Sequence, residues 1–137
     1  MNPPAEDSAA SRPNEWILVV DDEVEIGIFL TRGIGTDRLK VICVEDGPSA
    51  LRMLAERATD PLLIIADVLL PGGTDGLTLV RKLLTRLRRT KIVLMSGHLS
   101  ADSFWPTDLR EVTFLAKPFR LAQVVELVEA ARVEFRG

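Results

Sequence analysis

The chain has 137 residues, of which 47% are apolar, 27% are charged and 5% are aromatic, and its formal net charge is −3. This length suits one domain around a single core, and the composition is that of an ordinary globular protein. The acidic balance disfavours a nucleic-acid binder that depends on neutralising phosphates, and no stretch approaches the roughly 20 apolar residues of a membrane span.

The chain contains one cysteine and no recognisable targeting segment. Because Cys43 has no partner in the chain, an internal disulfide is excluded, and we expect its thiol to be buried filler in a strand. Residues 1–14 lack the basic start and apolar centre of a secretory signal peptide, so we predict a disordered tail before one domain over residues 15–137. These features favour a cytoplasmic protein.

Short apolar runs alternate with segments of helical periodicity along the chain. Strands are predicted at residues 16–20, 40–44, 62–67, 92–95 and 114–116. Helices are predicted at residues 23–33, 47–57, 76–87 and 121–133, the third of them capped by Asp75. This alternation indicates right-handed crossovers, and therefore an α/β fold with a doubly wound parallel sheet covered by helices on both faces.

The connection between the fourth and fifth strands departs from this pattern. It spans residues 98–112, has Pro106 near its middle and shows no continuous apolar stripe. We therefore expect a single turn near residues 100–104, then irregular chain or a second turn that starts at Pro106, in place of a regular fourth helix. Phe104 and Trp105 then either form a local core or present an aromatic patch to a partner.

One basic cluster stands out in this acidic chain. It surrounds the end of the third predicted helix and consists of Arg81, Lys82, Arg86, Arg88, Arg89 and Lys91. A solvated helix end is the simpler interpretation of such a cluster. We predict no nucleic-acid partner from it.

The carboxyl end of the third strand is the first candidate site. The apolar run 62–66 ends in Asp67, and in open parallel sheets ligands bind at the carboxyl ends of the strands. Other polar residues reach this edge from the first, fourth and fifth strands, and they are Asp21, Asp22, Ser96 and Lys117. Each of them alone could be a helix cap, a turn residue or a solvated lysine, so only their combination is informative.

Three carboxylates at one edge require cations. They repel one another, which raises their apparent pKa values unless positive charge is supplied by Lys117 and by a divalent metal, for which clustered hard oxygens favour Mg²⁺. A carboxylate nucleophile, a metal, a lysine and a hydroxyl are the parts of a phosphoryl-transfer site. The chain has neither G-x-G-x-x-G after its first strand nor G-x-x-x-x-G-K-[ST], which disfavours a nucleotide-binding fold.

These residues resemble the motifs of receiver domains of two-component response regulators, over residues 16–133. The motifs are Asp21-Asp22, Asp67-Val68-Leu69-Leu70-Pro71-Gly72, Ser96-Gly97 and Lys117-Pro118-Phe119, after the first, third, fourth and fifth strands. The resemblance implies a flavodoxin-like receiver fold with strand order 2-1-3-4-5, here with an irregular or shortened fourth helix. We expect a stand-alone receiver, similar to those of hybrid kinases because the loop 71–76 looks one residue longer than in many receivers.

The resemblance also implies a role for each carboxylate. Asp67 would be the phosphoacceptor, which takes a phosphoryl group from the phosphohistidine of a histidine kinase or a histidine phosphotransfer protein. Asp22 would bind Mg²⁺ directly, and Asp21 would do so directly or through water. Asp67 itself and the backbone carbonyl of Leu69 would complete the protein ligands of the metal.

The remaining motif residues would respond to the phosphoryl group. By resemblance, Ser96 would bond a phosphoryl oxygen, and Lys117 would pair with Asp67 before transfer and with the phosphoryl group afterwards. The bond before Pro118 would be cis. Phe114 would be the aromatic switch residue, which turns inward when the hydroxyl of Ser96 moves, so that two packings of the last third of the chain exchange populations.

Two residues at the rim of the site depart from the family pattern or lack a role. Leu69 lies where receivers often have a polar side chain, and an apolar group there would hinder the water that hydrolyses an acyl phosphate. His98, the only histidine, lies two residues after Ser96. It could orient water or donate a proton, although a solvated, non-catalytic position is the simpler interpretation.

The function implied is a phosphorylation-activated signalling switch rather than a turnover enzyme. The signal would leave by phosphotransfer or by contact with a downstream protein through the region 98–133, and a homodimer through the last helix is left open. Two alternatives remain: a partner-binding scaffold that acts without phosphorylation, and an aspartyl-phosphate hydrolase. The hydrolase is disfavoured, because neither Asp21-Asp22 nor Asp67-Val68-Leu69 supplies the D-x-D of haloacid-dehalogenase-type phosphatases.

Overall fold

A computed structural model describes residues 15–72, 75–97, 106–110 and 112–136 of the chain. The predicted tail 1–14, the turn expected near 100–104, His98, Phe104 and Trp105 lie outside the described residues. None of the helices in the described part is long and apolar enough to cross a membrane.

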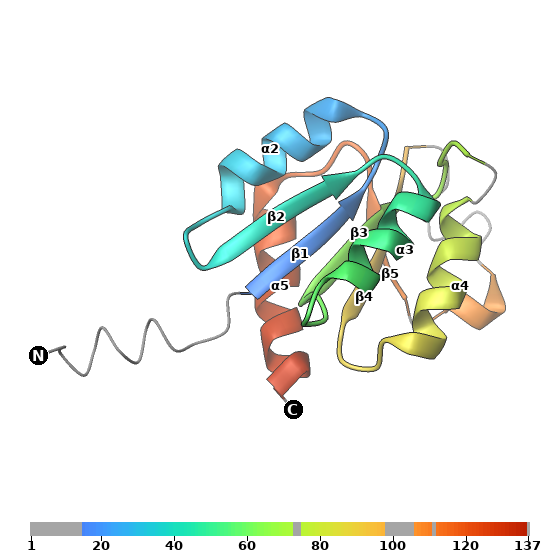
Figure 1. Cartoon of the computed structure of the whole chain (residues 1–137). Helices are drawn as coiled ribbons and strands as arrows, with labels where there is room; N and C mark the ends of the chain where they lie inside the picture. The colour runs from blue at the N-terminus through green and yellow to red at the C-terminus, as the bar shows by residue number, and fades with distance from the viewer. Residues whose placement is uncertain (1–14, 73–74, 98–105, 111, 137) are drawn as a thin grey trace, which may run out of the picture.

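The described residues form a single parallel sheet with helices between its strands. Its strands are β1 (Glu15–Val20), β2 (Leu39–Val44), β3 (Leu63–Asp67), β4 (Lys91–Ser96) and β5 (Thr113–Ala116). All four pairings are parallel and the order is β2-β1-β3-β4-β5, which confirms the expected fold (Figure 1). The α-helices are α2 (Val24–Ile34), α3 (Gly47–Glu56), α4 (Gly76–Arg86) and α5 (Leu121–Arg136).

The helices cover the sheet from both sides, and the central strands are therefore buried on both faces (Figure 1). In β1, Ile17 and Val19 join a core cluster with α2 and α5, whereas Leu18 joins one with α3 and α4. Successive strand residues point to opposite faces, so each layer needs its own apolar set. This explains why β1 and β3 are continuous apolar runs rather than alternating ones.

The start of α4 is held close to the end of β3. Asp75 caps the helix, as predicted, because its side chain accepts a hydrogen bond from the Thr78 backbone N–H at 2.7 Å. The N–H of Gly76 donates to the carbonyl of Val68 at 2.9 Å. A Cβ atom at position 76 would collide with the backbone carbonyl of Asp67, so only glycine allows the helix to begin this close to the strand end.

The connection between β4 and β5 is irregular in its described part. A 3₁₀ turn, η1 (Thr107–Leu109), follows Pro106, which confirms the second predicted turn. Leu109 and Val112 are buried in the core cluster with α4. Among the described residues of this connection, η1 is the sole helical turn, so the expectation of a shortened fourth helix agrees with the structure there.

Two expectations about other elements are wrong. Cys43 is exposed rather than buried, because β2 is an edge strand and its outer residues are covered on fewer sides than those of the central strands. The last helix ends at Arg136, three residues beyond the predicted Val133. Helix ends are the positions that periodicity predicts least well, because the last turn of a helix frays and has no sharp boundary.

Candidate functional site

Three strand ends at the same edge of the sheet bring predicted site residues together. Asp21 follows β1, Asp67 is the last residue of β3, and Lys117 follows β5. Asp67 and Asp21 are both buried, although both are acids. Burial of an ionised carboxylate without partners costs free energy, so these two side chains must have compensating contacts.

Lys117 is the centre of the cluster. Its Nζ lies 2.6 Å from Asp67 Oδ2, 2.7 Å from Glu23 Oε1 and 2.9 Å from Asp21 Oδ2. Burial lowers the pKa of the Lys117 ammonium, but hydrogen bonds to Asp67 and Glu23 and the ion pair with Asp21 outweigh burial and hold that pKa above the ordinary value for lysine. Lys117 therefore stays charged and stabilises a group of acids that would otherwise repel one another.

Asp21 is only partly satisfied within this cluster. Its Oδ1 accepts a hydrogen bond from the Glu23 backbone N–H at 2.8 Å. Its Oδ2 is buried and lacks a hydrogen-bond donor among the described residues, because Lys117 approaches as an ion pair without hydrogen-bond geometry. Burial raises the pKa of Asp21, and the Glu23 N–H and Lys117 offset that effect in part. One buried carboxylate oxygen is therefore left facing the other acids.

Asp67 is held in a defined orientation by the chain that follows it. Its Oδ1 accepts a hydrogen bond from the Leu69 backbone N–H at 2.9 Å, and its Oδ2 contacts Lys117. The N–H of Val68 donates to the carbonyl of Met95 at 2.9 Å, which ties this segment to β4. The side chain of Leu69 is 57% exposed, so it lies at the rim of the site rather than in the core.

The ends of β4 and β5 complete the edge. Ser96 is buried, and its carbonyl accepts a hydrogen bond from the Lys117 N–H at 2.9 Å. The bond between Lys117 and Pro118 is cis, as the resemblance implies. Phe114 is half-buried and lies opposite Leu94 in the register of β4 and β5. Residues 98–105 of the loop after β4, which include His98 and its predicted rim position, lie outside the described residues.

The acids at this edge suit a divalent cation. Asp21, Glu23 and Asp67 each offer one carboxylate oxygen, and these oxygens lie within 4.8 Å of one another. Three carboxylates face one ammonium group, so the cluster carries excess negative charge. The buried Asp21 oxygen without a hydrogen bond is a further sign of fit, because a cation would satisfy it. Hard oxygen ligands of this kind suit Mg²⁺.

The metal-competent cluster differs from the predicted one in a single member. Glu23 joins Asp21 and Asp67, whereas Asp22 is exposed and lies outside the cluster. Glu23 lies beside Asp21 because the chain bends at Asp22, where the Glu23 N–H donates to Asp21 Oδ1 at 2.8 Å. The apolar pattern of the sequence does not predict this bend, so it did not distinguish Glu23 from Asp22.

An exposed apolar surface beside the cluster is a second feature that the sequence did not reveal. On α2, which starts directly after Glu23, Val24 is 64% exposed, Ile28 is 45% exposed and Phe29 is 44% exposed. Phe119 lies next to this helix, with its ring centroid 6.1 Å from that of Phe29. Periodicity predicted an amphipathic helix, but the helix also carries apolar residues on its open side.

Sequence comparison identifies the family to which the chain belongs. A sequence model of the response regulator receiver domain matches residues 17–129. The chain belongs to this family. Aspartyl phosphorylation and Mg²⁺ binding are typical of receiver domains of two-component signalling, which are generally signalling switches rather than turnover enzymes. The acidic edge and Lys117 are what such chemistry requires.

Known relatives of this receiver domain carry further segments. It is 31% identical over 116 residues to the DNA-binding transcriptional regulator NtrC of Escherichia coli K12, which covers 84% of this chain and 24% of NtrC. It is 31% identical over 125 residues to the transcriptional regulatory protein PrrA of Mycobacterium leprae, with 90% of this chain and 52% of PrrA covered. The chain thus spans about a quarter of the length of NtrC and about half of the length of PrrA.

Solved structures agree with the fold. NtrX from Brucella abortus superposes with a TM-score of 0.75 and 28% identity, over 88% of this chain and 28% of that one. The receiver domain of the hybrid histidine kinase CckA superposes with a TM-score of 0.67 and 30% identity, over 85% of this chain and 97% of that one. The second match agrees with the expected similarity to hybrid-kinase receivers.

The partly satisfied carboxylate of Asp21 predicts a stabilising substitution. Without divalent cations at neutral pH, we expect Asp21→Asn to raise the free energy of unfolding by about 1 kcal/mol, because it removes a buried charge from an acidic cluster. The folded-state pKa of Asp21 is raised above the unfolded value of 3.8, so ionised Asp21 costs stability at neutral pH, and this cost disappears as the pH falls through the raised pKa to below 3.8.

Urea unfolding at a series of pH values measures this difference. The gap between wild type and Asp21→Asn should be largest at neutral pH and should close on acidification. Asp37→Asn is the matched control, because Asp37 is exposed and distant from the cluster in sequence. A variant that is less stable than wild type at neutral pH would contradict the prediction.

Proposed function

We propose that this receiver domain is a phosphorylation switch in which Asp67 accepts a phosphoryl group from the phosphohistidine of a histidine kinase or a histidine phosphotransfer protein. The observation that carries the proposal is the contact of 2.6 Å between Lys117 Nζ and Asp67 Oδ2. This cation lies against the carboxylate at the carboxyl edge of the sheet, where a ligand has access. A lysine in this position stabilises the negative oxygens of a transferring phosphoryl group.

The transfer requires little covalent work from the protein. A carboxylate oxygen of Asp67 forms the new bond to phosphorus, while the bond between phosphorus and the imidazole nitrogen of the donor breaks and its electron pair stays with the imidazole. The hydrogen bond from the Leu69 N–H orients Asp67 for this attack. Lys117, released from part of its contact with Asp67, then pairs with the phosphoryl oxygens, and the hydroxyl of Ser96 donates to one of them.

Asp21, Asp22, Asp67 and the Leu69 carbonyl are the proposed ligands of Mg²⁺. The buried Asp21 oxygen that lacks a hydrogen bond among the described residues supports this assignment. The ion supplies positive charge to the phosphoryl oxygens when it is bound. Glu23 is the competing ligand: its carboxylate contacts Lys117 at 2.7 Å, as those of Asp21 and Asp67 also do, but its longer side chain loses more rotamer freedom on binding than that of Asp22.

The exposed apolar face of α2 is the proposed docking surface for the phosphodonor. Val24, Ile28 and Phe29 lie on the helix that begins next to Asp21 and Glu23, so a partner that covers them would reach the site edge. Exposed apolar side chains on one helix face fit the apolar face of a partner helix. The phosphohistidine of the donor would then be held close to Asp67.

The switch would be transmitted from the site to the last third of the chain. Phosphorylation replaces the single carboxylate charge of Asp67 with a phosphoryl group that carries about one and a half to two negative charges, and this group attracts Ser96 and Lys117. Both residues border β5, because the Lys117 N–H donates to the Ser96 carbonyl. Their movement would allow Phe114, half-buried in β5, to change its packing, and partners would bind one of the two packings.

Asp67 is expected to be the sole acceptor of a phosphoryl group. When the full chain is incubated with labelled acetyl phosphate and Mg²⁺, wild type should acquire label and Asp67→Asn should acquire none, because an amide is not a nucleophile of this kind. Asp60→Asn is the matched control, since Asp60 precedes the same strand at the opposite edge and is exposed. Label on Asp67→Asn would assign the acceptor to another side chain.

Mg²⁺ is expected to stabilise the folded chain. A ligand that binds only the folded state raises the midpoint of thermal unfolding, and removal of the metal with a chelator reverses this. Asp21→Asn should abolish most of the rise, and Asp22→Asn should reduce it more than Glu23→Gln does. An equal or larger loss in Glu23→Gln would identify Glu23 as the third carboxylate ligand.

Leu69 is expected to lengthen the life of the phosphorylated state. Its exposed apolar side chain lies two residues after Asp67 and hinders an in-line water. Leu69→Asn should therefore speed the loss of label from phosphorylated protein several-fold, by about 0.5–1 kcal/mol of barrier. Leu84→Asn is a control for exchanging an exposed leucine elsewhere. Unchanged or slower decay in Leu69→Asn would contradict the role.

A further inference from the structure

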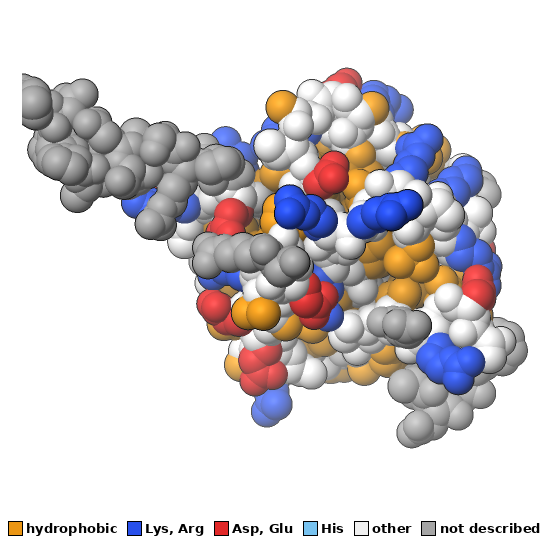
Figure 2. Space-filling view, turned by 90° about the horizontal axis from the view of Figure 1, so that it is seen from below, with side chains coloured by type: hydrophobic (Ala, Val, Ile, Leu, Met, Phe, Trp, Pro, Cys, Tyr) orange, Lys and Arg blue, Asp and Glu red, His pale blue; other side chains and the backbone are white. Residues whose placement is uncertain are grey.

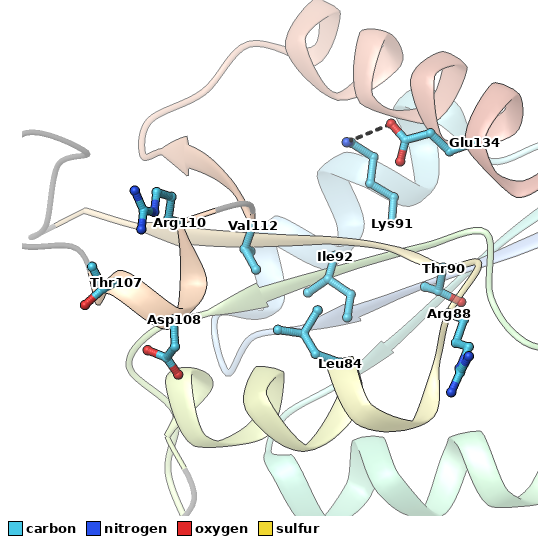
Figure 3. A pocket seen from close by; sticks show the side chains of 10 residues that line it. All are labelled: Leu84, Arg88, Thr90, Lys91, Ile92, Thr107, Asp108, Arg110, Val112 and Glu134. Carbon is cyan, nitrogen blue, oxygen red and sulfur yellow. Dashed lines mark hydrogen bonds and ion pairs between the residues drawn. The ribbon is translucent and has the colours of Figure 1, made fainter.

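A pocket of about 560 Å³ lies between the end of α4, the start of β4 and the η1 segment (Figure 3). Its position separates it from the phosphorylation site. Lys91, the first residue of β4, lines the pocket, whereas Asp67 lies opposite Met95, four residues further along the same strand. At about 3.3 Å per residue, the two sites are ~13 Å apart along the strand direction.

The pocket has a small apolar floor within a lining that is mostly polar. Leu84 of α4 is 42% exposed there, whereas Ile92 of β4 and Val112, just before β5, are largely buried beneath it. Within the described part of the connection before β5, only the three-residue turn η1 is helical. On the underside of the molecule as drawn in Figure 1, apolar side chains lie exposed between Lys and Arg side chains (Figure 2). Such a surface favours a ligand with both apolar and acidic groups.

The cations around this floor are unequally paired. Lys91 pairs with Glu134 at 3.3 Å, and Arg81 pairs with Asp108 at 2.7 Å. Arg88 and Arg110 have no ion pair with any other described residue, although the chain as a whole is acidic. Figure 3 shows Arg110 at one end of the pocket and Arg88 at the other, with the apolar side chains between them. Of the basic cluster noted in the sequence, Arg88 and Lys91 line this concave surface, and Arg110 joins them from the residue after η1.

We propose that this pocket binds an acidic segment of a partner protein, in which carboxylate side chains flank apolar ones. The apolar side chains would contact Leu84, Ile92 and Val112, and the carboxylates would accept hydrogen bonds from Arg88 and Arg110, whose planar guanidinium groups match a carboxylate. Separation of the two arginines by an apolar floor fits an extended peptide better than a compact anion. This interaction goes beyond the phosphorylation chemistry of Asp67 and does not depend on it.

A designed peptide tests both halves of this recognition. A fluorescein-labelled peptide of alternating Glu and Leu should raise its anisotropy on titration with the full chain, and increased salt should weaken the binding. A peptide of alternating Glu and Ser should bind more weakly because it lacks the apolar contacts. A peptide of alternating Lys and Leu should not bind. Failure of the Glu-Leu peptide to bind, or equal binding of the Lys-Leu peptide, would overturn the proposal.

Reversal of the charges of Arg88 and Arg110 tests whether the peptide binds in this pocket. The double variant Arg88→Glu, Arg110→Glu should weaken binding of the Glu-Leu peptide about tenfold, since two partly exposed ion pairs are lost. The matched control is Arg38→Glu, Arg52→Glu, which changes the net charge equally at exposed arginines outside the pocket. Equal weakening in both double variants would overturn the assignment to this pocket. The milder pair Arg88→Gln, Arg110→Gln serves if charge reversal disturbs folding.

Two further measurements exclude other occupants and separate the proposals. Binding of inorganic tripolyphosphate without binding of the peptide would identify a small-anion site and overturn the proposal. Self-association of the chain that Arg88→Glu, Arg110→Glu abolishes would assign the pocket to a second copy, with the same consequence. Labelling of Asp67 by acetyl phosphate is read on the same variants, and it should equal wild type. Failure of peptide binding and failure of phosphorylation are thereby distinguished.

Discussion

The contact of one ammonium group with three carboxylates is the interaction on which the functional edge depends. Lys117 comes from the end of β5, and the acids come from β1, β3 and the start of α2. Removal of Lys117 would leave buried charge without compensation, which costs more than the pair contributes. The cluster is therefore stable only while the strands that carry its members stay in their observed register.

The same cluster explains why the site can respond to a phosphoryl group. Lys117 is shared among the acids, and one oxygen of buried Asp21 has no hydrogen bond within the described structure, so the site retains capacity for more positive charge. The backbone around Asp67 is by contrast tightly tied, through Leu69 to its own side chain and through Val68 to β4. A fixed acceptor carboxylate beside a shared lysine is suited to a phosphoryl group whose negative charge arrives and leaves.

Much of the fold was predictable because its signals are local. Apolar runs bounded by turn residues located all five strands, and the cap Asp75 located the start of α4 within the described chain. Cys43 shows where local signals fail: an apolar strand pattern does not tell whether the strand lies at the centre or the edge of the sheet. The exposure of the apolar residues on the open side of α2 could not be predicted for the same reason, because burial depends on neighbours in space.

The sequence by itself determined that Asp67, Asp21, Ser96 and Lys117 share one edge, since parallel strands must all end there. Only the tertiary structure decided which acid contacts Lys117, because Glu23 rather than Asp22 reaches it once the chain turns into α2. Only the tertiary structure also placed Arg88 and Arg110 around one apolar floor, although they are 22 positions apart in the chain. Periodicity is a property of neighbours in sequence, whereas pairing of charges is a property of neighbours in space.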